Sequence, residues 1–493
     1  MPEHNAVVDP NGSWTYGELE GVISQTADWL RDNGVRAGDR VMVVGENCRE
    51  FAAVVLAITS LDAWPVPVNA HLSACEIDAV RDHCTARRIV YTTRVSLAAA
   101  EHANRHAAVA QEVRDLDQIC LGPLNQTAEP EAIDSEIGSR VAALIYTSGS
   151  TGLPKGVMLT HNNLIFSAGG AAKIRSLSPQ DRLYGVLPLS HIVGLSIVFL
   201  GTLLSGATIY LEPRFDPMTA RLTLERERIT VMLGVPTMFS QFLQYAKMRN
   251  LRSLKFPALR IISCSGAPLP HAIKTAVEGL FGLHLHHGYG ITECSPNVAQ
   301  VRLDVPPRED NSVGPMFPGV EARLVGSDSE PVAEGEVGEL WVRGPNIMKG
   351  YYLAPEETAA AVNAEGWFNT RDLARFEDGN LFIVGRTKDL IIRSGFNVYP
   401  AEVEAVLNAH PAVAQSAVIG KTTHGNEEIL AFVQPCTNSH LAATDLADFA
   451  AKHLAAYKRP TEFLLVSTMP MTASGKIAKS ELATMTDDFR RKR

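Results

Sequence analysis

The sequence has few features of secreted, metal-binding or nucleic-acid-binding proteins. Its 493 residues include only seven cysteines, which are scattered without a Cys-x-x-Cys pair, so neither a disulfide framework nor a zinc site of the usual spacing is expected. The net charge is −9, which argues against a general nucleic-acid or anionic-membrane binder. The first residues lack a basic region followed by an apolar run, so we expect no secretory signal. These features together favour a reduced, cytoplasmic protein.

One stretch approaches the length of a membrane span. Residues 193–211 carry no charge, and a spanning helix needs about 20 apolar residues. Ser205 and Gly206 interrupt the stretch, so we expect a buried helix followed by a short strand at 207–211. The basic end, residues 490–493, is interpreted as a solvated tail.

Helical and strand patterns alternate along the first two thirds of the chain. Apolar runs at 41–44 and 89–92 predict strands, and a helical pattern lies between them at 51–61. This alternation is typical of βαβ units, in which helices cover parallel sheets. After about residue 335 the pattern changes to period two, and Asp378-Gly379 marks a hairpin turn.

The last hundred residues form a second pattern. They predict strands at 390–392, 413–419, 429–433 and 463–467, and helices at 400–408 and around 444–456. A short charged junction at 387–389 suggests a hinge rather than a flexible linker. We therefore expect an α/β protein with a large N-terminal domain, 1–387, of parallel sheets with flanking helices and a smaller β-structure. A small mobile α+β lid, 388–493, would follow, with the active site between the two.

The strongest chemical signal is a loop rich in glycine and hydroxyl side chains. Residues 146–156 read Tyr-Thr-Ser-Gly-Ser-Thr-Gly-Leu-Pro-Lys-Gly and follow an apolar run at 141–145. The loop therefore leaves the carboxyl end of a predicted strand, where ligands bind in open α/β sheets. Its backbone N–H groups, hydroxyls and lysine suit a polyphosphate. The P-loop template fails, because Pro154 and Gly156 stand at positions where that template needs other residues.

Six segments in order resemble the adenylate-forming superfamily, which includes acyl-CoA synthetases, adenylation domains and insect luciferases. They are residues 146–156, 287–293, 366–372, 385–389, 394–404 and 474–476. The resemblance covers nearly the whole chain. It implies that a carboxylic acid attacks the α-phosphorus of ATP, giving acyl-AMP and pyrophosphate, and that coenzyme A then displaces AMP. ATP, Mg²⁺ and coenzyme A are the cofactors and partners that this chemistry requires.

The resemblance also implies roles for individual residues. Lys476 would stabilise charge between the carboxylate and the α-phosphate, Thr292 would contact that phosphate, and His191 would border the acyl pocket. Glu293, with Thr147 as a weaker candidate, would bind Mg²⁺, which prefers oxygen ligands. The expected nucleotide- and coenzyme-binding residues are Thr147, Ser148, Gly149, Ser150, Thr151, Lys155, Gly266, Ala267, His287, Gly288, Tyr289, Gly290, Thr292, Asp372, Arg386, Gly395 and Lys476.

One residue departs from the family pattern. Arg371 stands where relatives usually have glycine, so its backbone would be strained if that position requires a positive φ. Lys476 carries a further expectation: a lysine acetyltransferase acting on it would remove its charge and silence adenylation.

The identity of the acid is not specified by the sequence. An apolar, fatty or aromatic acid is favoured because the segments around His191 and Phe239 are mostly apolar, and no basic residue is clearly placed to pair a second carboxylate. The chain length favours a stand-alone enzyme. Three alternatives stay open: an adenylation enzyme that loads a carrier protein, an oxidative, luciferase-like enzyme, and a non-catalytic adenylate-binding protein.

Overall fold

The computed structural model describes residues 2–147, 155–305, 308–326, 330–393, 396–423, 426–436, 439, 441–471 and 477–491. An eight-stranded sheet lies at the centre of the larger, N-terminal part. Its strands are β1 (Asn5–Asp9), β2 (Gly12–Thr15), β10 (Arg182–Gly185), β11 (Thr208–Leu211), β12 (Val231–Gly234), β13 (Ile261–Cys264), β14 (Leu285–Gly290) and β15 (Asn297–Gln300). Their order is β15-β14-β13-β12-β10-β11-β1-β2. Only the outermost pair at each edge is antiparallel.

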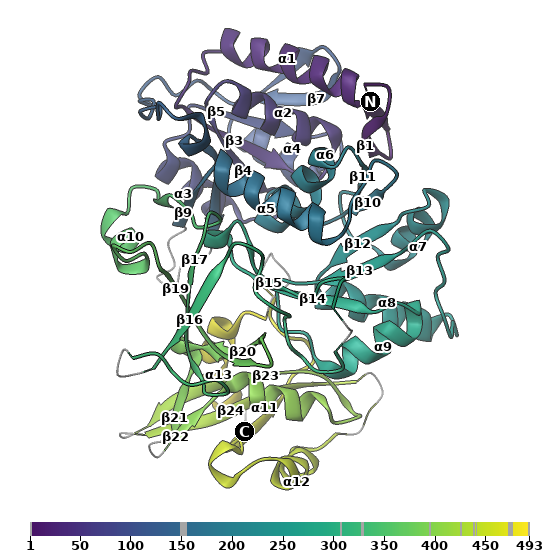
Figure 1. Ribbon diagram of the computed structural model, residues 1–493, viewed down its shortest axis with the longest axis vertical. Coiled ribbons are helices and arrows are strands. Elements are labelled where there is room, and N and C mark those ends of the chain that lie inside the picture. The colour runs from purple at the N-terminus through teal and green to yellow at the C-terminus, as the bar shows by residue number, and fades with distance from the viewer. Residues whose placement is uncertain are drawn as a thin grey trace.

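A second sheet of mixed direction lies towards the end of the molecule that carries the N-terminus (Figure 1). Its strands are β3 (Arg40–Gly45), β4 (Trp64–Asn69), β5 (Arg88–Thr92), β6 (Val109–Val113) and β7 (Leu116–Leu121). The order is β4-β3-β5-β7-β6, and β3 pairs in parallel with β4 and β5. The strands predicted at 41–44 and 89–92 therefore lie side by side, as expected for βαβ units.

Helices cover both sheets. They are α1 (Tyr16–Asp32), α2 (Arg49–Ser60), α3 (Ala74–Cys84), α4 (Leu97–Arg105), α5 (His161–Ile174), α6 (Gly201–Leu204), α7 (Pro217–Arg226), α8 (Pro236–Met248) and α9 (His271–Phe281). A π-helix, η2 (Val193–Leu200), precedes α6, and β11 follows it. The uncharged stretch at 193–211 is thus a buried helix and strand, as expected. Within the described ranges, the structure contains no helix with the length and apolar character of a membrane span.

Two smaller sheets complete the N-terminal part. Strands β8 (Val141–Thr147), β9 (Lys155–Thr160) and β18 (Gly350–Tyr351) form one, with the order β18-β9-β8. The other is antiparallel, in the order β16-β17-β19-β20. Its elements are β16 (Glu321–Val325), β17 (Gly338–Arg343), β19 (Phe368–Glu377) and β20 (Asn380–Arg386), and α10 (Pro355–Ala361) precedes β19. Asp378 and Gly379, both with positive φ, form the predicted two-residue hairpin turn.

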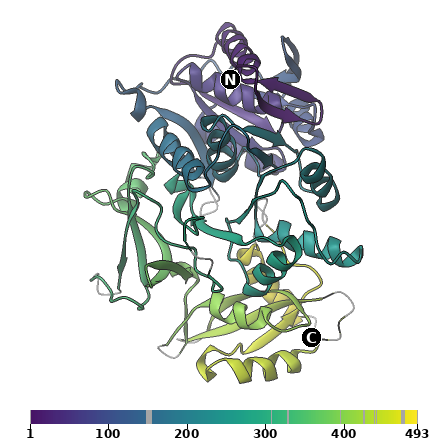
Figure 2. The same cartoon turned by 45° about the vertical axis from the view of Figure 1, so that its right-hand side comes forward.

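The C-terminal part lies at the opposite end of the molecule (Figures 1 and 2). It contains β21 (Ile391–Arg393), β22 (Phe396–Val398), α11 (Pro400–Asn408), β23 (Val413–Thr423), β24 (Asn426–Pro435), α12 (Ala443–His453), β25 (Glu462–Leu465) and α13 (Lys479–Arg491). The α/β fold with a large N-terminal and a small C-terminal unit is confirmed. The boundary itself, between residues 387 and 388, stays a prediction. It coincides with a short 3-10 helix, η4 (Thr387–Asp389).

The buried apolar residues divide at the same place. Two clusters have members between Ala6 and Leu381, and two others have members between Ile391 and Leu482. Each part of the chain therefore has its own hydrophobic core.

Candidate active site

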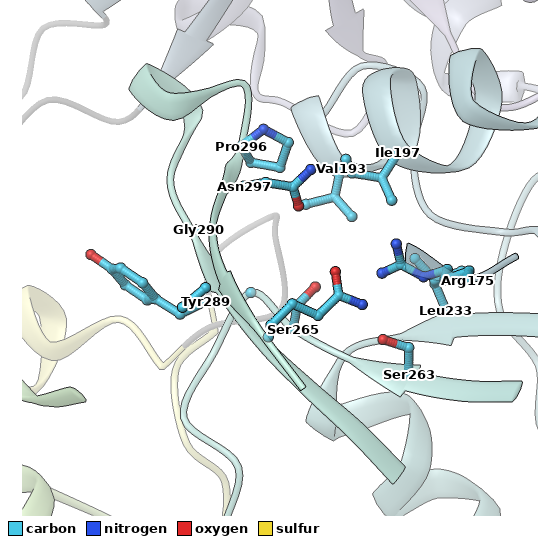
Figure 3. A pocket seen from close by; sticks show the side chains of 14 residues that line it. Arg175, Val193, Ile197, Leu233, Ser263, Ser265, Tyr289, Gly290, Pro296 and Asn297 are labelled. Atoms are coloured by element: carbon cyan, nitrogen blue, oxygen red, sulfur yellow. The ribbon is translucent and has the colours of Figure 1, made fainter. Parts of the chain in front are cut away.

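A pocket opens at the carboxyl ends of the central parallel strands, where open α/β sheets bind ligands (Figure 3). Its lining comes from the end of α5, from η2, from β12 to β15 and from the turns that follow β13 and β14. The lining residues are Arg175, Val193, Ile197, Leu233, Ser263, Ser265, Gly266, Gly288, Tyr289, Gly290, Pro296, Asn297, Ala299 and Gln300. The predicted residues Gly266, Gly288, Tyr289 and Gly290 therefore share one pocket.

The apolar wall of the pocket is supplied by the π-helix. Val193 and Ile197 both lie on it and line the pocket. Gly194 lies between them, and a Cβ there would lie 2.1 Å from the carbonyl oxygen of Pro188. Only glycine allows this close approach of the helix to the preceding turn. π-Helical segments occur frequently at functional sites.

Tyr289 connects the pocket to the antiparallel sheet. Its hydroxyl donates a hydrogen bond to Asp372, and Arg386 Nε donates to the same carboxylate at 2.9 Å. Burial, together with the Asp372 charge, holds the pKa of Tyr289 well above its usual value. Asp372 is 2% exposed. The residues predicted to bind adenosine thus form one hydrogen-bonded cluster that spans two sheets.

A second cluster joins Glu293 to Lys155 through Tyr351. Glu293 lies in a 3-10 helix, η3 (Thr292–Cys294), directly after β14, and its Oε1 accepts a hydrogen bond from the Tyr351 hydroxyl at 2.9 Å. Burial and the Glu293 charge raise the pKa of Tyr351. Lys155 Nζ lies 5.3 Å from the centre of the Tyr351 ring and forms an ion pair with Glu357. A carboxylate and an ammonium group therefore face one aromatic ring.

The two ends of the glycine-rich loop meet in the β8–β9 pair. Thr147 ends β8 and Lys155 begins β9, and the two residues lie opposite each other in the antiparallel pair. Ser148, Gly149, Ser150 and Thr151 lie outside the described residues. So do Lys476 and Gly395, and the roles predicted for all six stay predictions.

The predicted magnesium ligands fit the requirements of the ion. No group of three or more His, Cys, Asp or Glu side chains that could hold a metal occurs in the parts of the chain that the structure describes. Mg²⁺ needs no such cage, because it keeps several waters and is usually bound by one or two carboxylates plus substrate phosphates. Glu293, which is linked through Tyr351 to Lys155, provides a carboxylate of this kind. Thr147 offers a hydroxyl at the end of β8.

His287 lies in β14 and is 6% exposed. Burial, reinforced by the charge of Lys274, lowers its pKa to about 4, although contacts with the backbone of Ser312 and Ala267 oppose this shift. The imidazole is therefore neutral at pH 7. It supports the turn at Gly266 and Ala267, which follows the neighbouring strand β13. The nucleotide-binding role predicted for His287 stays a prediction.

His191 and Phe239 do not line the pocket. His191 Nδ1 accepts a hydrogen bond from the backbone N–H of Val193 at 3.3 Å, and Val193 is itself a lining residue. The role predicted for His191 at the border of the acyl pocket stays a prediction. Phe239 is fully buried and packs edge-to-face on Phe281, so it is a core residue. Thr292 is buried in η3, directly after the pocket-lining end of β14.

Arg371 occupies a left-handed backbone conformation. Its φ is +57°, a region in which an L side chain is disfavoured by roughly 1–2 kcal/mol. The strain predicted from the sequence is therefore present. The Asn369 side chain accepts the Arg371 N–H at 2.8 Å, and the Arg371 carbonyl accepts the Thr387 hydroxyl at 3.1 Å. These bonds hold the turn beside Asp372.

Three residues of the site were missed by the sequence analysis. Tyr351 and Glu357 lack a sequence signal, because only the tertiary fold brings them to Glu293 and Lys155. Arg175 is the third. The sequence did not identify a basic residue near the acyl group, whereas the structure places Arg175 in the pocket wall.

Comparisons with known proteins agree with this geometry. The family model for AMP-binding enzymes matches residues 1–352, and the model for the AMP-binding enzyme C-terminal domain matches residues 402–476. The feruloyl-CoA synthase of an Amycolatopsis species is 36% identical over 485 residues, which cover 98% of this chain and 96% of the relative.

Two groups of solved structures are also similar. ATP-bound MatB from Rhodopseudomonas palustris has a TM-score of 0.86 and 28% identity, with 99% of this chain and 97% of that chain covered. The o-succinylbenzoate CoA synthetase of Bacillus subtilis, in complex with its acyl-adenylate intermediate, has a TM-score of 0.83 and 28% identity. Coverage in that case is 98% of this chain and 96% of the other.

Proposed function

Because the chain belongs to the AMP-binding enzyme family, as an AMP-forming acid–thiol ligase that works through an acyl-adenylate, we propose that its substrate is a compact acid with an apolar or aromatic body. Coenzyme A is the thiol acceptor in this proposal. The observation that carries it is the pocket beside Tyr289, whose walls include Val193, Ile197 and Leu233. The similarity to a feruloyl-CoA synthase supports an aromatic acid.

The first half-reaction depends on positioning and charge. The acid's carboxylate oxygen bonds to the α-phosphorus of ATP, while the bond from that phosphorus to pyrophosphate breaks. Asp372, held by Tyr289 and Arg386, accepts the ribose hydroxyls. Lys155 exchanges its bond with Glu357 for a phosphate oxygen, and Lys476 stabilises charge between the reacting groups. Glu293 would hold Mg²⁺, and the bound ion would neutralise phosphate charge.

The second half-reaction joins the acyl group to the thiol. The thiol of coenzyme A releases its proton to solvent and its sulfur bonds to the acyl carbon, while the bond from that carbon to the phosphate oxygen of AMP breaks. The small C-terminal unit, proposed to begin at residue 388, rotates at η4 between the two steps, so that Lys476 leaves and the thiol arm enters. Gly395 would face that arm after the rotation.

A panel of acids tests this function directly. Pyrophosphate release should be faster with single-ring and short apolar acids than with acids of sixteen carbons. Thioester formation should then proceed with coenzyme A and not with an acyl carrier protein. Lys476→Ala should suppress acyl-AMP formation far more than thioester formation from supplied acyl-AMP. Preference for the long acids, or for the carrier protein, would contradict the proposal.

A further inference from the structure

Arg175 is a buried cation with an unused hydrogen-bond donor. It follows α5, and it is 5% exposed. Its Nη1 donates to the carbonyl of Ala171 at 3.1 Å, whereas its Nε is buried and has no hydrogen-bond partner. Burial lowers the pKa of the guanidinium to about 10, so the group still carries its charge at pH 7. A buried donor of this kind is costly to leave unpaired.

Among the described residues, Arg175 differs from the other arginines that have a buried nitrogen without a hydrogen-bond partner, because it forms no ion pair with a carboxylate. Within the described ranges, four further arginines have a buried nitrogen without a partner, and each of these has a carboxylate within 4.0 Å. The pairs are Arg49 and Arg94 with Asp9, Arg302 with Asp304, and Arg323 with Glu365. In the same part of the structure Arg175 forms no ion pair. Its charge is therefore uncompensated by the protein.

The side chain of Arg175 points into the pocket from the side opposite Tyr289 (Figure 3). Its backbone carbonyl is held by Arg260, directly before β13, with an Nη2 to oxygen distance of 3.0 Å. Arg175 and Ser263 lie at the side of the pocket lining opposite Tyr289 and Ser265 (Figure 3). Because the proposed function places the nucleotide at Tyr289, Arg175 lies at the end of the pocket away from that proposed site.

Two of the other polar lining residues, Ser263 and Asn297, are already engaged. The Ser263 hydroxyl donates to the carbonyl of His286 at 3.0 Å, and the Asn297 amide donates to the carbonyl of Ser167 at 3.1 Å. The apolar residues Ile197 and Leu233 form the rest of the wall around the guanidinium. An acceptor oxygen that enters this end of the pocket thus meets one charged donor in an apolar surrounding, where such a bond is strong.

We propose that Arg175 is a specificity-determining residue that binds an acceptor oxygen at the far end of the acid, opposite the carboxylate that is activated. The proposal rests on the proposed function and refines it: the preferred acid has an apolar body and a second oxygen group, either a phenolic hydroxyl or a carboxylate. Both groups accept hydrogen bonds from a guanidinium, and a carboxylate also supplies the missing counter-charge.

Matched acids test this role. Pyrophosphate release and binding by calorimetry would be measured with cinnamic acid, 4-hydroxycinnamic acid and 4-carboxycinnamic acid, and with hexanoic and adipic acids. The wild-type chain should favour at least one oxygen-bearing acid over its unsubstituted partner by about 10- to 100-fold, the range expected for a charge-assisted hydrogen bond. The hydroxyl and carboxyl arms identify which oxygen group it takes.

Variants separate specificity from a structural role of the same side chain. Arg175→Met should remove the preference by weakening only the oxygen-bearing acids, while Arg175→Lys should keep part of it. Lys173→Met, an exposed change on the same helix, is the matched control and should leave the preference unchanged. Equal loss with all acids in Arg175→Met, or no preference in the wild type, would overturn the proposal. A third outcome separates the two proposals. If the wild type binds the oxygen-bearing acids preferentially and Arg175→Met loses this preference, but no acid is adenylated, the role of Arg175 is sustained and the proposed function is contradicted.

Discussion

Arg386 and Asp372 lie directly opposite each other in the β19–β20 pair, with the Arg386 Nε 2.9 Å from the Asp372 carboxylate. Burial alone would lower the pKa of Arg386, but the Asp372 charge raises it above its usual value. The arginine thus pairs with a carboxylate at a buried position. The second oxygen of that carboxylate accepts the Tyr289 hydroxyl from the other sheet.

Asp372→Asn should weaken ATP binding, because an amide cannot accept hydrogen bonds at both positions. We expect the KM for ATP to rise by about 10- to 100-fold, the range for a lost hydrogen bond to a charged group. Pyrophosphate release at varied ATP concentration measures this effect. Asp378→Asn, in the exposed hairpin turn, is the control. An unchanged KM in Asp372→Asn would remove Asp372 from the nucleotide site.

Glu357→Gln should improve ATP binding. The ion pair between Lys155 and Glu357 must break before Lys155 reaches a phosphate, and both side chains are partly exposed. An exposed pair is worth about 0.2–1 kcal/mol, so the KM for ATP should fall by up to about fivefold. Glu356→Gln, an exposed change at the preceding position, should leave it unchanged. A higher KM in Glu357→Gln would mean that Glu357 positions Lys155 rather than competing for it.

His287 should make the fold sensitive to acid. Its pKa of about 4 in the folded chain lies below the usual value of 6.5, so the unfolded chain binds more protons between these pH values. Stability from this group is fully present above about pH 6.5 and is lost as the pH falls towards 4.

The effect can be measured by urea unfolding between pH 4 and 7.5. His287→Gln should lose less stability than the wild type across this window, by up to about 3 kcal/mol. The exposed histidine variant His284→Gln should follow the wild type. Parallel pH profiles for all three proteins would show that His287 is not buried in its neutral form.

Lys388→Pro should separate the two half-reactions. Proline fixes φ near −65° and removes an N–H, so it should restrict the proposed rotation at η4. We expect near-normal pyrophosphate release in a first turnover and about 10²-fold slower thioester formation, because misplaced reacting groups cost about this much. Lys388→Ala keeps the backbone free and should behave as the wild type. Equal slowing of both steps by the proline would place the hinge elsewhere.

Local sequence patterns predicted the helices and strands, but they did not predict contacts between residues that are distant in the sequence. The helix expected at 400–408 is α11 with the same bounds, because Pro400 starts it and its apolar face is regular. Strand β23 extends to Thr423, beyond the predicted end at 419, because polar residues continue the hairpin with β24. Hairpin pairing, not apolar periodicity, determines that length.

The residues of the candidate site divide in the same way, into those that local patterns predicted and those that only the tertiary structure reveals. Asp372 and Arg386 were predicted because each lies in a recognisable segment. Arg175 was missed, since a cation at the end of a helix is ordinarily explained by the helix dipole. Only the packing of α5 against the central sheet shows that this particular arginine is buried in a ligand pocket.

Because the two parts of the chain have separate hydrophobic cores, a rotation at η4 would not need the free energy of disrupting core packing. In the described part of the chain, no buried apolar cluster includes residues from both sides of η4. A rigid rotation of the C-terminal unit would therefore exchange surface contacts while leaving both interiors packed. Two orientations related in this way differ by only a few kcal/mol, and a ligand shifts their populations by its difference in affinity for them. In the proposed mechanism, replacement of ATP by acyl-AMP would supply such a difference in affinity.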